Sequence, residues 1–174
     1  MSVINTYIEN VVNYDLLNKF RYNSIKNIPK IQKIYLNFNC KTTLLKSLLS
    51  SLIALELISL QKSTFTYTKT SNILFKVKKG SPVGCTVVLR RSNMEEFLTE
   101  LITNIFPKLE YTNKLSLNIK KLRIFSFKIK NPLIFQELEK RYQFFNNLIN
   151  LNITIVTNAK TKKELKFLLN AFKI

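Results

Sequence analysis

The sequence predicts an α+β fold, with one domain over residues 1–174 in which an antiparallel β-sheet is covered by helices mainly on one face. Two kinds of periodicity support this prediction. Side chains alternate between apolar and polar in residues 31–38 and 121–129, as in half-buried strands, whereas apolar residues recur at helical spacing in residues 3–20. No linker, low-complexity tract or internal repeat divides the chain. We therefore expect a single domain whose second sheet face stays open for a partner.

The first half of the chain is predicted to hold a helix over residues 3–20, a strand over 31–38, a Leu-rich helix over 43–59 and a strand over 64–69. The first strand separates an apolar row, Ile34, Leu36 and Phe38, from a polar row, Lys33, Tyr35 and Asn37. The second strand is rich in β-branched and aromatic residues, and its threonines share one face. The polar row thus offers a cation, an aromatic ring and an amide to a partner.

The second half is predicted to hold a strand over residues 85–91, a helix over 92–106, strands over 121–129 and 151–157, and a helix over 161–172. Ser92 and Glu95 have the spacing of a capping box, and Pro107 is expected to stop the helix that they open. Thr161 and Glu164 have the same spacing at the start of the last helix. Both helices therefore carry a start signal in the sequence.

A strong positive charge distinguishes the chain. It has 28 Lys and Arg against 10 Asp and Glu, which gives a net charge of +18. Such an excess opposes compaction by self-repulsion, so we expect a polyanionic partner. Nucleic acid and an anionic membrane surface are the candidates. A membrane partner is disfavoured because no stretch approaches the roughly 18 uncharged apolar residues that a spanning helix needs.

Several absences argue against an enzyme. The chain has no His, the commonest general base and zinc ligand. Its two glycines, Gly80 and Gly84, are too few for a dinucleotide or phosphate-binding loop. Cys40 and Cys85 share no short spacing, so we expect small core-type residues and no metal site. The sequence therefore predicts no catalytic residue, no cofactor and no small-molecule substrate.

Five segments of the chain carry a recognisable pattern. They are residues 20–24 (FRYNS) with 28–37 (IPKIQKIYLN), 57–62 (LISLQK), 80–90 (GSPVGCTVVLR), 94–98 (MEEFL), and 152–161 (NITIVTNAKT) with 168–172 (LLNAF). In this order, and over nearly the whole chain, they resemble the motifs of universal large-subunit ribosomal protein five. The chain is similar to the bacterial type of that family, which carries 5S rRNA, and more narrowly to an organellar member.

The resemblance implies a structural, non-enzymatic constituent of the large ribosomal subunit. It implies binding of 5S rRNA, where the ribosome has one, and of large-subunit rRNA in the central protuberance. It also implies contact with P-site tRNA, neighbouring ribosomal proteins and a small-subunit head protein. The alternative is a free RNA-binding regulator or RNA chaperone that uses the same sheet face. A regulator should wash off large subunits in high salt, which separates the two hypotheses.

Seven polar residues are predicted to lie on or beside the open sheet face, and the resemblance favours RNA contact for them: Asn37, Gln61, Thr64, Thr66, Lys69, Thr86 and Arg90. Amides and hydroxyls suit ribose 2′-hydroxyls and base edges, and cations suit phosphates. By alternation, Thr86 and Arg90 should share one face of a strand. The alternative is that these residues simply face water, with Arg90 in a surface ion pair.

A long basic loop is predicted over about residues 71–84. Loops of this length inside a compact domain are usually functional. The resemblance implies that it reaches toward the elbow of P-site tRNA, through Ser71, Phe75, Lys76, Lys78, Lys79 and Gly80. The alternative is a solvated lysine run with Phe75 packed at the base of the loop.

The chain departs from the family pattern in two regions. Leu60 and Ser63 stand where the family has Gly and Pro, so the backbone there is expected to differ. The family's glycine-rich stretch is missing from residues 112–122, and residues 127–145 align poorly. The bridge to the small subunit therefore cannot be carried over to particular residues.

Composition also bears on the origin of the chain. It has 23 Lys to 5 Arg, 20 Asn and 19 Ile, which are residues of A+T-rich codons, Arg apart. The resemblance begins within the first few residues, so we expect no cleavable transit peptide. We expect a protein encoded and used inside a mitochondrion. A plastid or the cytoplasm of an A+T-rich bacterium is the alternative.

Overall fold

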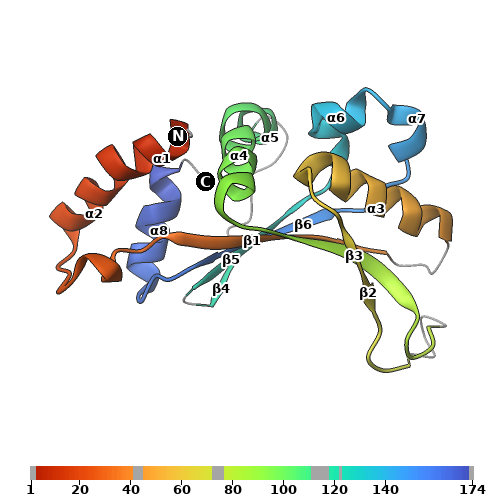
Figure 1. Ribbon diagram of the computed structural model, residues 1–174, viewed down its shortest axis with the longest axis horizontal. Coiled ribbons are helices and arrows are strands. Elements are labelled where there is room, and N and C mark those ends of the chain that lie inside the picture. The colour runs from red at the N-terminus through yellow and green to blue at the C-terminus, as the bar shows by residue number, and fades with distance from the viewer. Residues whose placement is uncertain (1–2, 41–44, 72–76, 111–117, 122, 173–174) are drawn as a thin grey trace. The chain divides into compact units, whose positions relative to one another are not determined.

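The computed structural model describes residues 3–40, 45–71, 77–110, 118–121 and 123–172. Its strands are β1 (Ile31–Asn39), β2 (Thr64–Tyr67), β3 (Pro82–Leu89), β4 (Asn118–Lys121), β5 (Ile124–Ile129) and β6 (Leu151–Thr157). They form a six-stranded sheet in the order β2-β3-β1-β6-β5-β4 (Figure 1). β2 pairs antiparallel with β3, and β4 with β5. The predicted α+β class is therefore confirmed.

The chain divides into two compact units, and the boundary falls within β1, β5 and β6. Unit 1 comprises Met1–Ile34, Arg90–Phe127 and Thr154–Ile174, and unit 2 comprises Tyr35–Leu89 and Lys128–Ile153. Each unit has its own buried residues, and the single domain stays a prediction. None of the helices that the structure describes is long and apolar enough to cross a membrane.

Burial alternates along the strands as the sequence predicts. In β1 the buried residues are Ile34, Leu36 and Phe38, and in β5 they are Phe125, Phe127 and Ile129. The residues between them, including Lys33, Tyr35 and Asn37, keep part of their surface exposed. One boundary is wrong: β5 begins at Ile124, and residues 118–121 form a separate strand. Within each unit the helices lie on one side of the strands (Figure 1).

In unit 1, helices from both ends of the chain pack together. They are α1 (Val3–Tyr7), η1 (Ile8–Val12) and α2 (Asn13–Lys19), which continue one another, and α8 (Lys162–Ala171). The rings of Phe20 and Phe167 lie 5.9 Å apart, and the Nζ atom of Lys19 lies 4.4 Å from the Phe167 ring centre. The Tyr7 hydroxyl donates to the carbonyl of Ala171 at 3.1 Å. These contacts join the N-terminal helix to α8.

The capping box predicted for the last helix is confirmed. Thr161 Oγ1 accepts a hydrogen bond from the Glu164 N–H at 3.2 Å, and Glu164 Oε2 accepts from the Thr161 N–H at 3.3 Å. The buried Glu164 also acts on Tyr22, whose hydroxyl is buried and has no hydrogen-bond partner in the described chain. Burial, and then repulsion by Glu164, raise the pKa of Tyr22 to about 12.

The helix predicted over residues 92–106 begins and ends differently. The N-cap of α4 (Arg91–Glu100) is Arg90, without a side-chain cap, and Ser92 Oγ donates to Glu96 Oε1 at 3.3 Å instead. Pro107 does not stop the helix, because η3 (Leu101–Ile105) and α5 (Phe106–Glu110) continue it. A proline ring normally clashes with the carbonyl four residues earlier. The wider π turn of η3, directly before Pro107, relieves that clash.

In unit 2, α3 (Leu45–Ser59) packs on β3, with η4 (Pro132–Ile134), α6 (Gln136–Glu139) and α7 (Tyr142–Phe145) beside it (Figure 1). The buried Ser51 hydroxyl donates to the Leu48 carbonyl at 2.9 Å. Its oxygen lies 3.5 Å from the sulfur of Cys40 and 3.6 Å from that of Cys85. Both thiols are free, and burial raises the pKa of Cys85. The predicted core role is confirmed for Cys85, whereas Cys40 is half-buried.

The turn after α3 keeps a left-handed backbone even though Leu60 replaces glycine. Leu60 has a φ of 52°, and its N–H donates to the Glu56 carbonyl at 2.9 Å. Glycine usually supplies this conformation at the end of a helix. Ser63 differs from the family's proline in another way, since its N–H donates to Glu56 Oε1 at 3.0 Å. Proline has no N–H, so this bond depends on the replacement.

We expect Leu60→Gly to raise the free energy of unfolding by about 1 kcal/mol. A leucine in the left-handed region costs about 1–2 kcal/mol, and the entropy of glycine takes back part of that gain. Leu60→Ala is the matched control, because it removes the exposed side chain but keeps the Cβ atom. Urea unfolding measures both. An equal gain from Ala would mean that the exposed side chain, and not the backbone, limits stability.

Candidate RNA-binding surface

Six of the seven predicted RNA-binding residues belong to unit 2. They are Asn37 in β1, Gln61 after α3, Thr64 and Thr66 in β2, Lys69 after β2, and Thr86 in β3. The seventh residue, Arg90, belongs to unit 1. It does not share a strand face with Thr86, because β3 ends at Leu89 and Arg90 is the exposed N-cap of α4. That part of the prediction is wrong, since alternation stops where the helix begins.

Three of the residues form a row across neighbouring strands. Thr64 of β2 pairs with Thr86 of β3. The Cys40 N–H donates to the Val83 carbonyl at 2.8 Å, which sets the register of β1 against β3. Counting along the two antiparallel strands from this bond places Asn37 opposite Thr86. The row of Thr64, Thr86 and Asn37 lies on the face of unit 2 that points away from α3. We call this face the polar face.

The threonine hydroxyls of the polar face donate within the sheet. Thr64 Oγ1 donates to the Thr86 carbonyl at 3.2 Å, and Thr86 Oγ1 donates to the Leu36 carbonyl at 3.2 Å. A hydroxyl has one proton, so each threonine presents acceptor lone pairs to a partner. The partner must therefore bring hydrogen-bond donors. Ribose 2′-hydroxyls and base amino groups are such donors.

Asn37 adds an acceptor that no described residue satisfies. Its Oδ1 atom is buried and has no hydrogen-bond partner, and the same is true of Oδ1 of Asn152 in β6, the strand next to β1. A buried acceptor without a partner costs about 1–3 kcal/mol, which a donor from a ligand removes. Asn152 was not predicted from the sequence. The alternation of residues 151–157 between apolar and polar side chains could have identified it.

Gly84 brings the strands of the polar face close together. It lies in β3 opposite Thr66 and is buried. A Cβ atom at this position would collide with the carbonyl oxygen of Phe38 and lie 3.0 Å from Thr66 Oγ1. Only a residue without a side chain fits there, and Thr66 is half-buried against it.

Gln61 lies on a turn whose main chain is held by serines. Ser59 Oγ accepts from the Gln61 N–H at 3.3 Å, and Ser63 Oγ donates to the Leu52 carbonyl at 3.2 Å. The Gln61 side chain is half-exposed, and Lys69 on the other side of β2 is exposed. The turn therefore holds Gln61 beside the start of β2.

The predicted tRNA-facing loop is shorter than expected, because β3 begins at Pro82 and residues 82–84 are strand. Thr68, which the prediction missed, closes its base: the Thr68 N–H donates to the Ser81 carbonyl at 3.0 Å and its Oγ1 to the Lys78 carbonyl at 2.7 Å. Of the predicted residues, Ser71, Lys78, Lys79 and Gly80 are exposed, whereas Phe75 and Lys76 lie outside the described residues.

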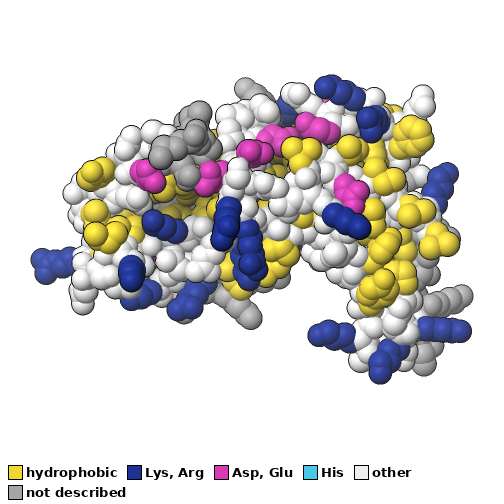
Figure 2. Space-filling model, in the orientation of Figure 1, with side chains coloured by type: hydrophobic (Ala, Val, Ile, Leu, Met, Phe, Trp, Pro, Cys, Tyr) yellow, Lys and Arg dark blue, Asp and Glu magenta, His cyan; other side chains and the backbone are white. Residues whose placement is uncertain are grey.

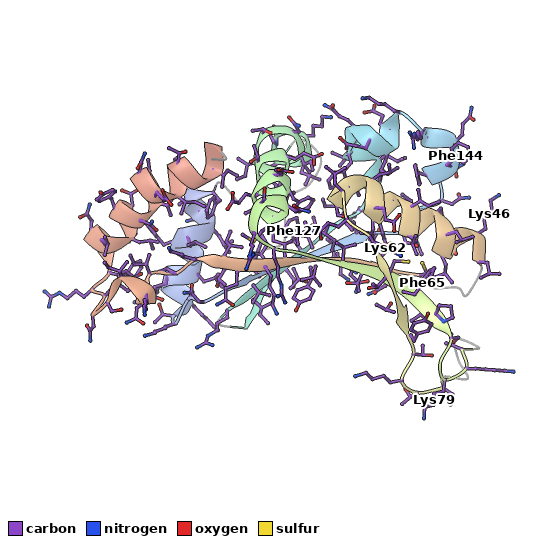
Figure 3. All side chains as sticks on the ribbon, in the orientation of Figure 1. Lys46, Lys62, Phe65, Lys79, Phe127 and Phe144 are labelled. Carbon is purple, nitrogen blue, oxygen red and sulfur yellow. The ribbon has the colours of Figure 1, made fainter. Side chains whose placement is uncertain are left out.

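Lysines surround the polar face. Lys62, Lys69, Lys78 and Lys79 are exposed, and Figure 3 shows Lys79 at the far end of the β2–β3 hairpin from Lys62. Figure 2 shows several dark-blue side chains at that end of the hairpin and no acidic ones among them. Cations beside a row of hydrogen-bond acceptors match the phosphates and ribose hydroxyls of RNA.

Comparison with known proteins identifies the family. A family model that describes the C-terminus of the ribosomal uL5 family matches residues 82–174. Large ribosomal subunit protein uL5m of Reclinomonas americana is 40% identical over 177 residues, which cover 100% of this chain and 97% of that protein. The uL5 proteins of Blochmanniella floridana and Nitrosomonas eutropha are 35% and 36% identical, over 99% and 96% of this chain and 92% and 94% of their own. The chain belongs to the uL5 family of large-subunit ribosomal proteins.

Membership of the uL5 family gives the function in outline. The chain is a structural constituent of the large ribosomal subunit and not an enzyme, as the sequence predicts. Its partners are rRNA and other ribosomal components. Relatives from a mitochondrion and from bacteria are both among the matches.

We expect Gly84→Ala to lower the free energy of unfolding of this uL5-family chain by about 3 kcal/mol, since a methyl group forced against a backbone carbonyl must displace a strand. Gly80→Ala is the control: a Cβ atom there meets nothing within 4 Å, and only the φ of +81° opposes it. That substitution should cost about 1 kcal/mol. Urea unfolding gives both values, and equal costs would show that close strand contact at Gly84 is not limiting.

Proposed function

We propose that this chain binds 5S rRNA and large-subunit rRNA in the central protuberance of a mitochondrial ribosome. The polar face of unit 2 is the proposed rRNA surface, and the segment around residues 71–81 contacts P-site tRNA. Neighbouring ribosomal proteins and a small-subunit head protein complete the proposed partners. Family membership and the net charge of +18 support this assignment.

The row of Thr64, Thr86 and Asn37 is the observation that carries the proposal. All three residues offer acceptors, and the Asn37 acceptor is buried without a partner in the described chain. The wide minor groove of A-form RNA displays 2′-hydroxyls, which donate hydrogen bonds and distinguish RNA from DNA. The flanking Lys62 and Lys69 are exposed and suit the phosphates beside those riboses.

The tip of the hairpin suits a partner that moves. Lys78 and Lys79 are exposed at the turn, where the Thr68 bonds close the base of the segment. Lysine is a strongly hydrated point charge on a flexible stem, so it binds phosphate without the fixed bidentate geometry of arginine. A tRNA that must leave the P site requires such a weak contact.

A mitochondrial location is supported by the match to uL5m of Reclinomonas americana. The Lys, Asn and Ile content points to an A+T-rich gene, which organelle genomes share with some bacteria. Sequencing the RNA that co-purifies with the chain would identify the ribosome and show whether it contains a 5S rRNA.

We expect Asn37→Ala and Gln61→Ala each to weaken binding to a 5S rRNA transcript by about 1–2 kcal/mol, the usual loss for a hydrogen bond to a polar partner. Filter binding measures the affinity. Asn37→Ala should leave the Tm of the free protein unchanged or higher, because it removes a buried acceptor that has no partner in the free chain.

Asn146→Ala is the matched control, since Asn146 is exposed after α7 and outside the polar face. It should change neither RNA affinity nor Tm. A fall in Tm for Asn37→Ala with unchanged RNA affinity would make Asn37 a structural residue and contradict the proposed surface.

We expect the double substitution Lys78→Ala and Lys79→Ala to leave incorporation into the large subunit intact. It should speed dissociation of P-site tRNA, by at most about 1 kcal/mol per phosphate contact. Both quantities are measured on purified ribosomes, with the exposed pair Lys130→Ala and Lys140→Ala as the control. Normal tRNA retention with poor incorporation would make the hairpin tip an rRNA anchor instead.

A further inference from the structure

Six exposed cations from three separate segments meet at one end of unit 1. They are Lys26, Lys30, Arg123, Lys160, Lys162 and Lys163, which we call the basic end. None of them was among the residues predicted to bind RNA. Figure 2 shows dark-blue side chains along the lower edge of unit 1 and acidic ones along its upper side.

Asn158 and Lys160 tie two of the segments together. The Asn158 Oδ1 atom accepts from the Lys30 N–H, and its Nδ2 donates to the Ile28 carbonyl at 3.3 Å. Lys160 Nζ donates to Asn27 Oδ1 at 3.1 Å. The turn before β1 and the turn before α8 therefore lie side by side, and both carry lysines.

Thr157 ties in the third segment. Its N–H donates to the Arg123 carbonyl at 2.9 Å, and its Oγ1 donates to the same oxygen at 3.3 Å. Arg123 thus lies at the start of β5 next to the end of β6. Lys26 belongs to the short helix η2 (Ile25–Asn27), whose start is capped by Ser24 Oγ accepting from the Lys26 N–H at 3.2 Å. Backbone geometry therefore holds these cations together.

The charges of the basic end are not compensated within these segments. Glu164 is the only acidic residue in residues 20–30 and 157–164. Its Oε2 atom accepts from the Lys160 N–H at 2.9 Å, and the side chain is buried in the capping box. Lys162 and Lys163 lie in the first turn of α8, where the helix dipole is positive and cations are unfavourable. The arrangement therefore costs free energy until an anion binds.

We infer that the basic end binds phosphates of rRNA, as a second contact made by residues other than those of the polar face. The inference rests on the proposed function. A membrane-binding surface combines cations with several exposed apolar side chains. Among the described residues of these three segments, Ile25 alone is a large and exposed apolar one. Phosphates held by clustered side chains of Lys and Arg are the usual mode of RNA backbone binding.

The test compares the salt dependence of binding to total rRNA extracted from large subunits. The variant Lys30→Gln, Lys160→Gln and Lys163→Gln removes three charges, and glutamine at position 160 keeps a donor for Asn27. Each phosphate contact contributes about 0.7–0.9 to the slope of log Kobs against log salt, so the slope should fall by about 2–3. The Tm of the free variant should stay the same or rise.

The control variant removes three exposed lysines of unit 2, Lys46→Gln, Lys130→Gln and Lys140→Gln. An equal fall in slope for both variants would show that only total charge matters and would overturn the inference. An unchanged slope for the basic-end variant would also overturn it, and the proposed function stands if Asn37→Ala still weakens RNA binding. If Asn37→Ala has no effect either, both proposals fail.

Vesicles containing about 30% phosphatidylglycerol provide the remaining arm of the test, because anionic lipid headgroups also carry phosphates. The wild-type chain should bind them no better than the basic-end variant does. Loss of vesicle binding by the variant, with an unchanged rRNA slope, would assign the basic end to a lipid surface and overturn the inference.

Discussion

Alternating burial along β1 is the constraint on which the rest of the structure depends. Ile34, Leu36 and Phe38 have no exposed surface, so they determine which side of the strand meets the helices. Because side chains alternate with a period of two, a shift by one residue would exchange the buried side for the polar side. The same register sets Asn37 opposite Thr86. The polar face is therefore a consequence of core packing, and it needs no local preference for RNA.

Close contact between the strands converts that register into a surface. Gly84 lets β3 approach the main chain of β1, and the hydroxyl of Thr86 reaches the Leu36 carbonyl across the gap. With their protons used in the sheet, the threonines become acceptors. The hydrogen-bonding character of the polar face is thus set by cross-strand contacts as well as by residue type. A serine or threonine elsewhere on a solvated strand would offer both a donor and an acceptor.

These contacts explain which features the sequence predicts and which it does not. Strand alternation and the Thr161 capping box are local patterns, and both are confirmed. Pro107 inside a helix depends on a π turn whose hydrogen bonds no local pattern encodes. The row across β2, β3 and β1 depends on register between strands that are distant in sequence. Likewise, the basic end gathers lysines that are about 130 residues apart, as the Lys160–Asn27 bond shows.

The free chain keeps several groups unsatisfied, and a polyanion with donors would satisfy them together. The Asn37 and Asn152 acceptors are buried without partners in the described part of the chain. Lys162 and Lys163 lie at the positive end of a helix. Such groups lower stability, so they persist only where a bound state returns that free energy. Ribose hydroxyls supply donors and phosphates supply negative charge on one molecule. Assembly with RNA and full stability of this fold are therefore coupled through the same residues.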